Sequence, residues 1–267
     1  MDYIPPLRLM EEIETSSKKK AGLSIRSMLL TGFLSGALLA YATAYAFKAS
    51  DGLSEGMASL VAGTVFPVGF AMIVLLGLEL ATGNFAILPV GIARGKATYS
   101  EMLRNWCWVY LGNFLGCIFF GFLFSIMLTE AFFQPSGTLG AKIIAVAQSK
   151  TLVYEHAGVN GWLTAFVKGI LCNWMVALGT VLGLSSVSTI GKIVAIWLPI
   201  SMFFALALEH SIVNMFVIPT AIFLGADITV SQWIIWSQIP VTLGNIVGGA
   251  FFAGLLLHYA NKPSLAL

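Results

Sequence analysis

Residues 78–89 read Leu78-Glu79-Leu80-Ala81-Thr82-Gly83-Asn84-Phe85-Ala86-Ile87-Leu88-Pro89, and residues 208–219 read Leu208-Glu209-His210-Ser211-Ile212-Val213-Asn214-Met215-Phe216-Val217-Ile218-Pro219. Leu, Glu, Asn and Pro occupy the same register in both stretches, and Glu209 follows Glu79 by 130 residues. Each stretch places an ionisable residue, small or polar residues and a proline inside an apolar segment. Paired interruptions of this kind are the best sequence indication of a binding site in a membrane transporter.

The composition of the chain is that of an integral membrane protein. The 267 residues are 58% hydrophobic and 10% charged, whereas a soluble domain carries about 25% charged residues. Continuous apolar runs of about 20 residues are long enough to span the hydrocarbon as helices, while barrel strands alternate in segments of about ten. We therefore predict an all-α membrane protein.

The apolar runs predict six transmembrane helices, at about 27–47, 58–80, 105–128, 161–184, 193–210 and 233–258. The second and fifth do not end cleanly, because the sequence after Glu79 and Glu209 turns small or polar and then resumes as a short apolar piece. We interpret each as a broken helix. The residues assigned to the two breaks are Glu79, Gly83, Asn84, Ser211 and Asn214.

The similarity extends beyond the breaks. Residues 111–120 (LGNFLGCIFF) and 243–252 (LGNIVGGAFF) are identical at six of ten positions. With three spans in each half, a repeat of about 27–128 and 161–258 must be inverted across the membrane plane. We expect this 3+3 repeat to form a channel domain over 27–260.

Basic residues predict the orientation. With both chain ends on one side, that side holds ten Lys and Arg residues and the other holds three (Lys48, Lys142 and Lys150). The positive-inside rule then places both termini in the cytoplasm of a multi-pass protein of the cell (plasma or inner) membrane. The ten are Arg8, Lys18, Lys19, Lys20, Arg26, Arg94, Lys96, Arg104, Lys192 and Lys262.

Two terminal segments flank the channel domain. Residues 1–26 are predicted to form a cytoplasmic amphipathic segment, in which Leu7, Leu9, Met10 and Ile13 alternate with charged residues before the run Lys18–Lys20. Such a helix can be anchored to anionic headgroups by its lysines. Residues 261–267 are predicted to be a short cytoplasmic tail.

Ionisable residues inside spans are costly and indicate function by default. Each copy has one glutamate, Glu79 or Glu209. The two residues either accept hydrogen bonds from backbone N–H groups freed by the breaks or handle substrate and protons.

His210 aligns with Leu80 and is therefore not required by the repeat. Its imidazole can exchange a proton near physiological pH or hydrogen-bond an anion. By the same argument Thr82, which aligns with Ile212, is expected to line a pore.

Other residues near the breaks leave alternatives open. Phe66, Phe70 and Phe203 either pack or oppose one another across a pore as an apolar constriction. Lys150 either attracts anions to the pore mouth or is a solvated loop residue. Lys168 either snorkels or pairs with a glutamate.

Several function classes are disfavoured. Cys107, Cys117 and Cys172 have no CxxC spacing, which argues against a disulfide framework or a zinc site. The chain holds no HExxH motif, so we expect neither an enzyme nor a cofactor, and no nucleic-acid partner. A water or glycerol channel would carry paired Asn-Pro-Ala signatures, whereas here each Asn precedes its Pro by five residues.

Four strings, in order along the chain, resemble the formate/nitrite transporter family. They are LELATGN (78–84), KGILCNW (168–174), LEHSIVNM (208–215) and LGN (243–245). The resemblance implies an aquaporin-like fold, a homopentamer with one pore in each protomer, and passage of a small monovalent anion. Formate is favoured over nitrite or hydrosulfide only because it is the family's commonest substrate.

The resemblance also assigns roles to residues. His210 matches the family's central histidine, Thr82 its threonine at the break, and Lys150 its anion-attracting lysine. The family's paired pore asparagines match Asn173 and Asn245. Its two constrictions match Phe66, Phe70 and Phe203 on one side and Leu80, Ala81 and Val176 on the other.

Two departures qualify these assignments. Ala81 stands where the family has a bulky residue, and the stretch from Lys150 to Asn173 is several residues longer than usual. Because a bare anion crosses hydrocarbon at great cost, we expect transport to depend on pH, with protonation near His210 producing the neutral acid. In a proton-independent channel, His210 would act only as a hydrogen-bond donor.

Overall fold

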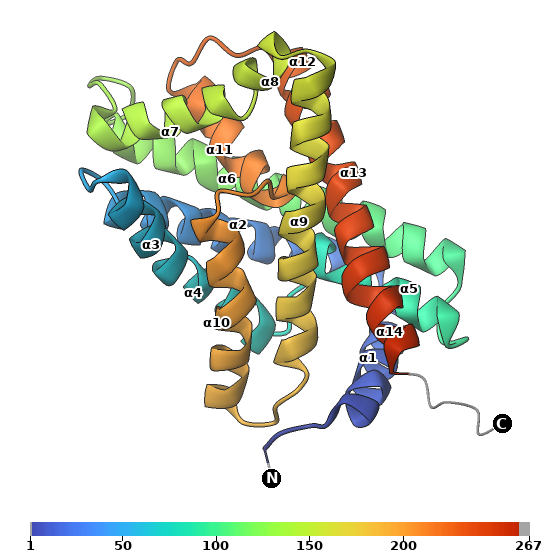
Figure 1. Cartoon of the computed structure of the whole chain (residues 1–267). Helices are drawn as coiled ribbons and strands as arrows, with labels where there is room; N and C mark the ends of the chain where they lie inside the picture. The colour runs from blue at the N-terminus through green and yellow to red at the C-terminus, as the bar shows by residue number, and fades with distance from the viewer. Residues whose placement is uncertain (1, 262–267) are drawn as a thin grey trace, which may run out of the picture.

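The computed structural model describes residues 2–261, so Lys262 and all but the first residue of the predicted tail 261–267 lie outside the described residues. The described part of the chain is helical, with one isolated β-bridge between Tyr3 and Ser186. Figure 1 shows the elements, which are α1 (Pro6–Ala21), α2 (Ile25–Ala49), α3 (Glu55–Val65), α4 (Pro67–Leu75), α5 (Ala81–Ala93), α6 (Tyr99–Leu128), α7 (Gly137–Ser149), α8 (Leu152–His156), α9 (Val159–Gly183), α10 (Thr189–Ala205), α11 (Ser211–Phe223), α12 (Val230–Trp233), η1 (Ile234–Gln238), α13 (Ile239–Val247), η2 (Gly248–Leu256) and α14 (Leu257–Ala260).

Five helical segments of the described residues are long and apolar enough to cross a membrane. They are Ile25–Ala49, Glu55–Leu75, Tyr99–Leu128, Val159–Gly183 and Val230–Ala260. The fifth predicted span, 193–210, corresponds to α10, whose 17 residues fall short of the roughly 20 that cross the hydrocarbon. The chain reaches its break at the end of α10 and continues as α11.

Both helices are interrupted as predicted, but the interruptions lie earlier in the chain than expected. Of the residues assigned to the breaks, only Glu79 lies outside a helix, whereas Gly83 and Asn84 belong to α5 and Ser211 and Asn214 to α11. The chain leaves helical geometry over residues 76–80, between α4 and α5, and over residues 206–210, between α10 and α11. Each break turns through a residue with positive φ, Gly77 at 65° and Ala207 at 50°. Such a φ carries no steric cost for glycine but strains alanine, so the second break holds backbone strain that the first lacks.

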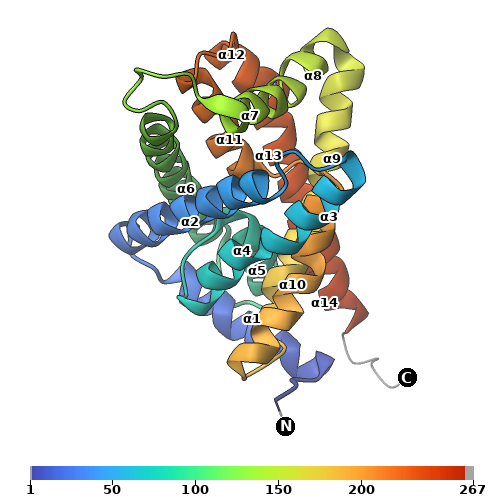
Figure 2. The same ribbon diagram turned by 90° about the vertical axis from the view of Figure 1, so that its left-hand side faces the viewer.

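One region differs from the prediction, because the stretch between the third and fourth spans contains two helices, α7 and α8. Figure 2 shows α7 lying across one end of the molecule beside α11. Thirteen residues are too few to span a membrane, and Leu139, Ile143 and Ala147 at four-residue spacing bury one face of α7. A search for apolar runs of span length does not detect such a helix.

The N-terminal amphipathic helix is present as α1, but its apolar face packs on protein. Leu9, Met10 and Ile13 are buried in a cluster with Ile87 and Val90 of α5. The apolar face of α1 is therefore buried against protein, and the anchoring of its lysines to headgroups stays a prediction. Figure 1 shows α1 and the end of α14 at one end of the molecule, hereafter the terminal face, and α7, α8 and α12 at the other, the α7 face.

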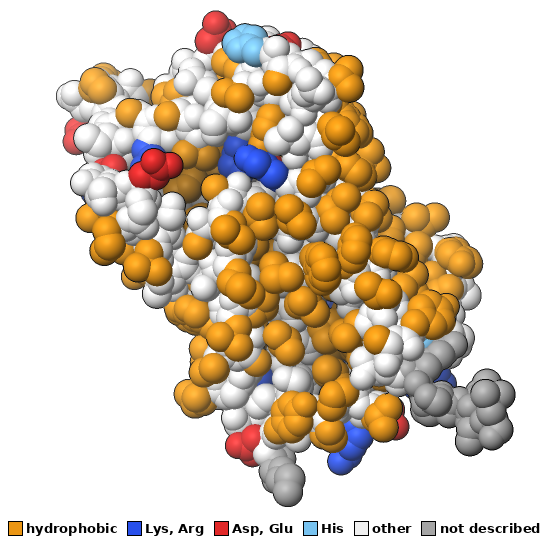
Figure 3. All heavy atoms as spheres, viewed as in Figure 1, with side chains coloured by type: hydrophobic (Ala, Val, Ile, Leu, Met, Phe, Trp, Pro, Cys, Tyr) orange, Lys and Arg blue, Asp and Glu red, His pale blue; other side chains and the backbone are white. Residues whose placement is uncertain are grey.

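The last long segment contains π-helical turns. Residues Ile234–Gln238 and Gly248–Leu256 have π geometry, whereas α6 is α-helical over its 30 residues. Gly249 lets this segment approach α5 closely, because a Cβ there would lie 3.0 Å from the Phe85 Cβ. Figure 3 shows a broad apolar surface over the middle of the molecule, with charged side chains gathered towards its ends, as expected of a multi-pass membrane protein.

Candidate functional site

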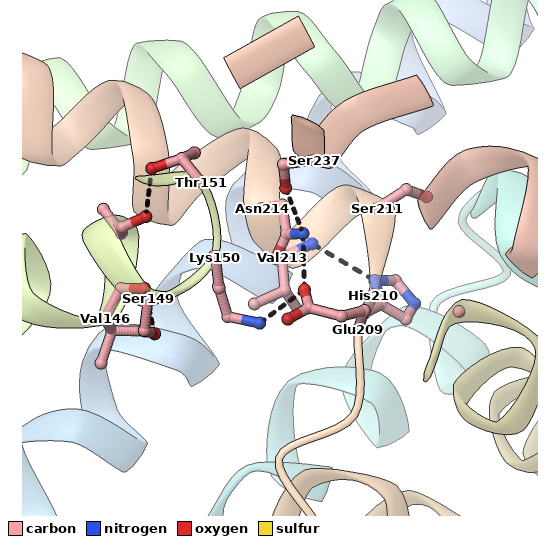
Figure 4. Close-up of polar contacts among 12 residues, drawn as sticks. Val146, Ser149, Lys150, Thr151, Glu209, His210, Ser211, Val213, Asn214 and Ser237 are labelled. Atoms are coloured by element: carbon pink, nitrogen blue, oxygen red, sulfur yellow. Dashed lines mark hydrogen bonds and ion pairs between the residues drawn. The ribbon is translucent and has the colours of Figure 1, made fainter. Parts of the chain in front are cut away.

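Glu209, at the second break, is held by three side chains. Its carboxylate accepts hydrogen bonds from Lys150 Nζ at 2.8 Å, from the Tyr154 hydroxyl at 2.8 Å and from Asn214 Nδ2 at 2.9 Å. Asn214 Nδ2 also donates to Ser237 Oγ at 3.1 Å. Figure 4 shows Lys150 reaching from the end of α7 to Glu209, with Asn214 and Ser237 on the other side of the carboxylate.

Glu79, at the first break, has a matching set of partners. Its carboxylate accepts hydrogen bonds from Lys20 Nζ at 2.9 and 3.0 Å and from Asn84 Nδ2 at 2.7 Å. Asn84 Nδ2 also donates to Asn105 Oδ1 at 2.8 Å. Lys20 was not among the predicted site residues, although it precedes Lys150 by 130 residues, the separation of the two glutamates. That separation is the sequence signal that would have found it.

The hypothesis that the glutamates brace the breaks by accepting backbone N–H bonds is wrong in its chemistry. Two asparagines do this instead. Asn113 Oδ1 accepts from Ala81 N at 3.0 Å, while its Nδ2 donates to the carbonyls of Gly32 and Glu79. Asn245 makes the equivalent bonds, accepting from Ser211 N at 2.9 Å and donating to the carbonyls of Gly169 and Glu209.

The two expected pore asparagines therefore differ. Asn245 donates both of its amide hydrogens to backbone carbonyls, which leaves it no N–H to donate to a passing anion. Asn173 Nδ2 donates to the carbonyls of Thr82 and Asn245, at 3.1 and 2.7 Å, but its Oδ1 is buried without a partner among the described residues. The hydroxyls of Thr82 and Ser211 are likewise buried and unpartnered in that part of the chain.

His210 is the N-cap of α11. Its Nδ1 accepts a hydrogen bond from Val213 N at 3.2 Å, the dashed line beside the ring in Figure 4. The ring stacks on Phe203 with the centroids 5.7 Å apart, and only 1% of the residue is exposed. Because Nδ1 is an acceptor, a neutral ring carries its proton on Nε2, which therefore remains available as a donor.

Two cavities approach the breaks from opposite faces. The Lys150 cavity, on the α7 face, has a volume of about 200 Å³ and is lined by residues that include Lys142, Lys150, Phe203, Phe204, Leu208 and His210. The Lys20 cavity, on the terminal face, has a volume of about 180 Å³ and is lined by residues that include Lys19, Lys20, Phe70, Glu79, Leu80 and Asn84. Since a water molecule occupies about 30 Å³ in the liquid, each cavity is large enough for a small hydrated anion.

The expected constriction residues are distributed differently from the prediction. Phe70 lines the Lys20 cavity with Leu80, rather than lying with Phe203. Phe66 packs edge-on against Phe203 at 5.5 Å and stacks on Phe204 at 4.0 Å. The two cavities share no lining residue, so they are separate in this structure.

Ala81 and Val176 line neither cavity. Both are fully buried, Ala81 in a cluster with Met28, Phe85 and Val109, and Val176 in the main core. Ala81 is the first residue of α5, and the Met28 and Phe85 side chains occupy the space beside it. The small side chain is thus accommodated by core packing and does not widen either cavity.

The longer stretch after Lys150 contributes to the site rather than displacing it. It forms α8, whose Tyr154 donates to Glu209. Burial, with a smaller contribution from the Glu209 carboxylate, raises the pKa of Tyr154, so its hydroxyl remains protonated and able to donate. The Lys168 ammonium lies 5.9 Å from the centre of the Tyr154 ring, a cation–π contact that the sequence did not predict.

Among the described residues, no group of three or more His, Cys, Asp or Glu side chains is placed to hold a metal ion. Cys107 is exposed, whereas Cys117 and Cys172 are buried and free. The polar chemistry of the centre is thus confined to hydrogen-bond donors and acceptors, two ion pairs and the His210 ring.

Comparisons with known proteins agree with this geometry. The family model described as "Formate/nitrite transporter" matches residues 8–259. A probable formate transporter from Methanothermobacter thermautotrophicus is 37% identical over an alignment of 251 residues that covers 91% of this chain and 90% of the relative. A solved structure described as an FNT family ion channel superposes with a TM-score of 0.84 at 26% identity, covering 96% of this chain and 99% of the other. A second, described as a pentameric formate channel with formate bound, gives 0.73 at 29% identity, covering 88% and 97%.

Proposed function

The chain belongs to the formate/nitrite transporter family, and on that premise we propose that it conducts a small monovalent anion, formate in the first place, across the cell membrane. The observation that carries the proposal is His210, which lines the Lys150 cavity with its ring held through Nδ1 and its Nε2 without a protein partner among the described residues. A formate-bound neighbour structure supports formate as the first substrate to test.

The proposed pathway runs from one cavity to the other past the two breaks. The helices α5 and α11 both begin there, at Ala81 and Ser211. The N-terminus of a helix carries a partial positive charge, so two such ends stabilise an anion halfway across. We assign the apolar barrier between the cavities to Phe70 and Leu80 on one side and Phe66 and Phe203 on the other.

We propose that His210 acts as a neutral hydrogen-bond donor through Nε2. A doubly protonated ring would turn Nδ1 into a donor and break its bond from Val213 N, so the cap favours the neutral form. Thr82 is proposed to supply a further bond, because its hydroxyl is buried and unpartnered in the described part of the chain. Asn173 Oδ1 is also unpartnered, but it is an acceptor, and both hydrogens of Nδ2 are donated to carbonyls, so Asn173 can bond only the protonated acid. The alternative is a proton relay, in which the anion crosses as its neutral acid after protonation near His210.

The His210→Asn and His210→Ala variants separate these two roles. An asparagine at an N-cap supplies an acceptor for the helix N–H groups and keeps an N–H donor, whereas alanine supplies neither and costs about 1 kcal/mol as a cap. We expect His210→Asn to retain formate uptake into proteoliposomes with an unchanged pH profile, and His210→Ala to lose most of it. His156→Asn, at an exposed position of α8, is the matched control.

Loss of the pH profile in His210→Asn would overturn the neutral-donor role and favour the relay. Uptake of formate, nitrite and hydrosulfide by the unaltered protein ranks the anions. Swelling of the vesicles in glycerol without flux of any of them would contradict anion transport altogether and favour a neutral-solute channel.

We further propose that the protein is a homopentamer with one pathway in each protomer and that its two halves form an inverted repeat. The pentameric neighbour supports the assembly. The repeat is supported by paired contacts at the two breaks. In each half, a glutamate accepts hydrogen bonds from a lysine and an asparagine, and a second asparagine accepts from the backbone N–H of the first residue of the following helix. The residues are Glu79, Lys20, Asn84 and Asn113 in one half and Glu209, Lys150, Asn214 and Asn245 in the other. Both termini are assigned to the cytoplasm, which places the Lys20 cavity on that side.

A further inference from the structure

The positive charge of Lys150 is largely neutralised by the carboxylate of Glu209. Its ammonium lies 2.8 Å from Glu209 Oε2, with 13% of the lysine side chain and 3% of the glutamate side chain exposed. Lys150 lines the cavity and Glu209 lies directly behind it, so an approaching anion experiences an ion pair whose fields cancel at distances much larger than the separation of the two charges. This pair gives the cavity a local donor but no net charge.

A second lysine lines the same cavity. Lys142, on α7, donates from Nζ to the Phe47 carbonyl at 3.1 Å and to Ser50 Oγ at 2.9 Å. Both partners are neutral, and no carboxylate of the described residues forms an ion pair with Lys142. An ammonium has three donor hydrogens, so one remains after these two bonds.

Asp51 is the acid that acts on Lys142, and it balances the charge only in part. Its carboxylate accepts a hydrogen bond from Thr138 at 2.8 Å and does not line the cavity. Burial lowers the pKa of Lys142, and the more weakly acting Asp51 raises it. The ammonium is thus partly desolvated, a condition under which charge interactions are less screened than in open solvent.

The Lys20 cavity is likewise lined by two lysines, of which one is in an ion pair. Lys20 is paired with Glu79 at 2.9 Å, while Lys19, which also lines the cavity, has no ion pair with any described residue. In each cavity, one lysine is paired with the glutamate of a break, and the charge of the second lysine is not neutralised by that glutamate. Lys19 is more exposed than Lys142, so its charge is better screened by solvent.

We propose that Lys142, rather than Lys150, supplies the net positive charge with which the Lys150 cavity concentrates small monovalent anions before they reach His210. This inference rests on the proposed function. A charge in a cleft raises the local concentration of the oppositely charged solute and its rate of entry. Salt shortens that reach, to about 8 Å at physiological ionic strength.

Lys142 also has a structural role to be separated from this one, because its bonds to Phe47 and Ser50 hold the C-terminal end of α2. A lysine at a helix C-terminus stabilises the helix dipole. Loss of that role would lower the thermal stability and reduce transport equally at every salt concentration. Loss of anion recruitment would reduce transport only at low salt and limiting substrate.

The test is formate uptake by proteoliposomes of known protein orientation, with formate added at the α7 face at low and at high concentration of an impermeant salt. We expect Lys142→Gln, which keeps a donor for Phe47 and Ser50, to lower the initial rate at limiting formate roughly two- to tenfold at low salt. The difference should vanish at high salt and at saturating formate. Lys142→Arg should restore the rate, and Lys48→Gln, an exposed lysine of α2 outside this cavity, should leave it unchanged.

Asp51→Asn provides a change in the opposite direction, because removing the opposing acid should raise the rate at low salt. Equal rates for Lys142→Gln and the unaltered protein at low salt would overturn the proposal. A reduction that persists at high salt together with a lower melting temperature would also overturn it, in favour of the structural role. Absence of formate, nitrite and hydrosulfide uptake by the unaltered protein would instead refute the proposed function on which the inference rests.

Discussion

Buried polar side chains around the two breaks differ in whether the protein itself satisfies their hydrogen bonds. Asn113 and Asn245 bind only backbone groups, whereas the hydroxyls of Thr82 and Ser211 bind nothing in the described part of the chain. A buried polar group without a partner costs about 1–3 kcal/mol. The satisfied residues thus maintain the breaks, and the unsatisfied ones are the candidates for contact with a solute.

A Thr82→Val substitution tests this division. Valine has nearly the shape of threonine, and the hydroxyl it removes has no partner, so we expect the melting temperature to stay within about 2 °C, the shift of a change well below 1 kcal/mol. Formate flux should fall roughly tenfold or more, because a hydrogen bond to a charged group contributes about 1.5–3 kcal/mol. Flux in proteoliposomes and thermal unfolding in detergent provide the two measurements.

The matched control for Thr82→Val is Thr220→Val, whose hydroxyl is also buried and unpartnered among the described residues. Neither threonine lines either cavity, but Thr82 is the second residue of α5, beside the break, whereas Thr220 lies in the last turn of α11. Thr220→Val should preserve both flux and stability. Undiminished flux in Thr82→Val would remove Thr82 from the pathway.

At this scale, the sequence predicted residues whose chemistry is unusual for a membrane span. It identified Glu79, Glu209 and His210, because each is costly there unless it has a role. It did not identify Lys20 or Tyr154, because a lysine in a charged segment and a tyrosine in a connecting stretch are ordinary residues. Their contact with the two glutamates depends on where α1 and α8 pack, which composition does not reveal.

Among the helices, α1 and α7 have a common task, since each lies on one face of the molecule and delivers a lysine to a break. The position of α1 depends on apolar packing against α5 and on Glu14, which contacts Arg94 at 2.5 Å and Lys96 at 3.0 Å. Arg94, with a smaller contribution from Lys96, holds the pKa of Glu14 below its ordinary value. Such a carboxylate stabilises the packed helix only while it is ionised.

The docking of α1 should therefore weaken in acid. The contribution of Glu14 is fully present above the ordinary pKa of glutamate, about 4.3, and is lost as the pH falls through the lowered value. We expect hydrogen exchange in α1, measured by mass spectrometry, to accelerate relative to α9 over that range. The effect should be modest, because these ion pairs are partly exposed and screened.

Glu14→Gln should exchange faster than the unaltered protein near neutral pH and should show no further acceleration from this residue in acid. Glu12→Gln, at an exposed position of the same helix, should behave as the unaltered protein does. The same acid response in Glu14→Gln and in the unaltered protein would show that other carboxylates control α1.

The helices that could be predicted are those for which hydrophobicity and length suffice. The long segments and both breaks follow from the apolar runs and their interruptions. The short α7 was missed because 13 residues give no spanning signal. The π turns of η1 and η2 were missed because an apolar run of span length does not distinguish π from α turns. Phe85 packs closely against Gly249, and no local sequence pattern specifies that contact.

Over the whole molecule, two cavities open on opposite faces and stop short of one another, on either side of residues contributed by both halves of the chain. The proposed orientation places the terminal face and α1 in the cytoplasm and α7 outside. The sequence supports this through ten basic residues on one side against three on the other.

Single cysteines test the orientation in a Cys107→Ser background, which removes the exposed native thiol. We expect Gln134→Cys, between α6 and α7, to react with a membrane-impermeant maleimide in intact cells. Glu11→Cys, at an exposed position of α1, should react only after the cells are permeabilised. Labelling of Glu11→Cys in intact cells would reverse the assigned orientation.

The ion pair between Lys20 and Glu79 also decides where the chain can be shortened or fused to another protein. Removing residues that precede α1 leaves the pair intact, whereas a deletion reaching Lys20 strands a carboxylate that is only 5% exposed. Leaving one member of a buried pair without its partner costs about 3–5 kcal/mol, a large part of the stability of an ordinary domain. The N-terminal helix is consequently not an appendage for an engineer to exchange freely: any replacement has to bring an ammonium group to the same position.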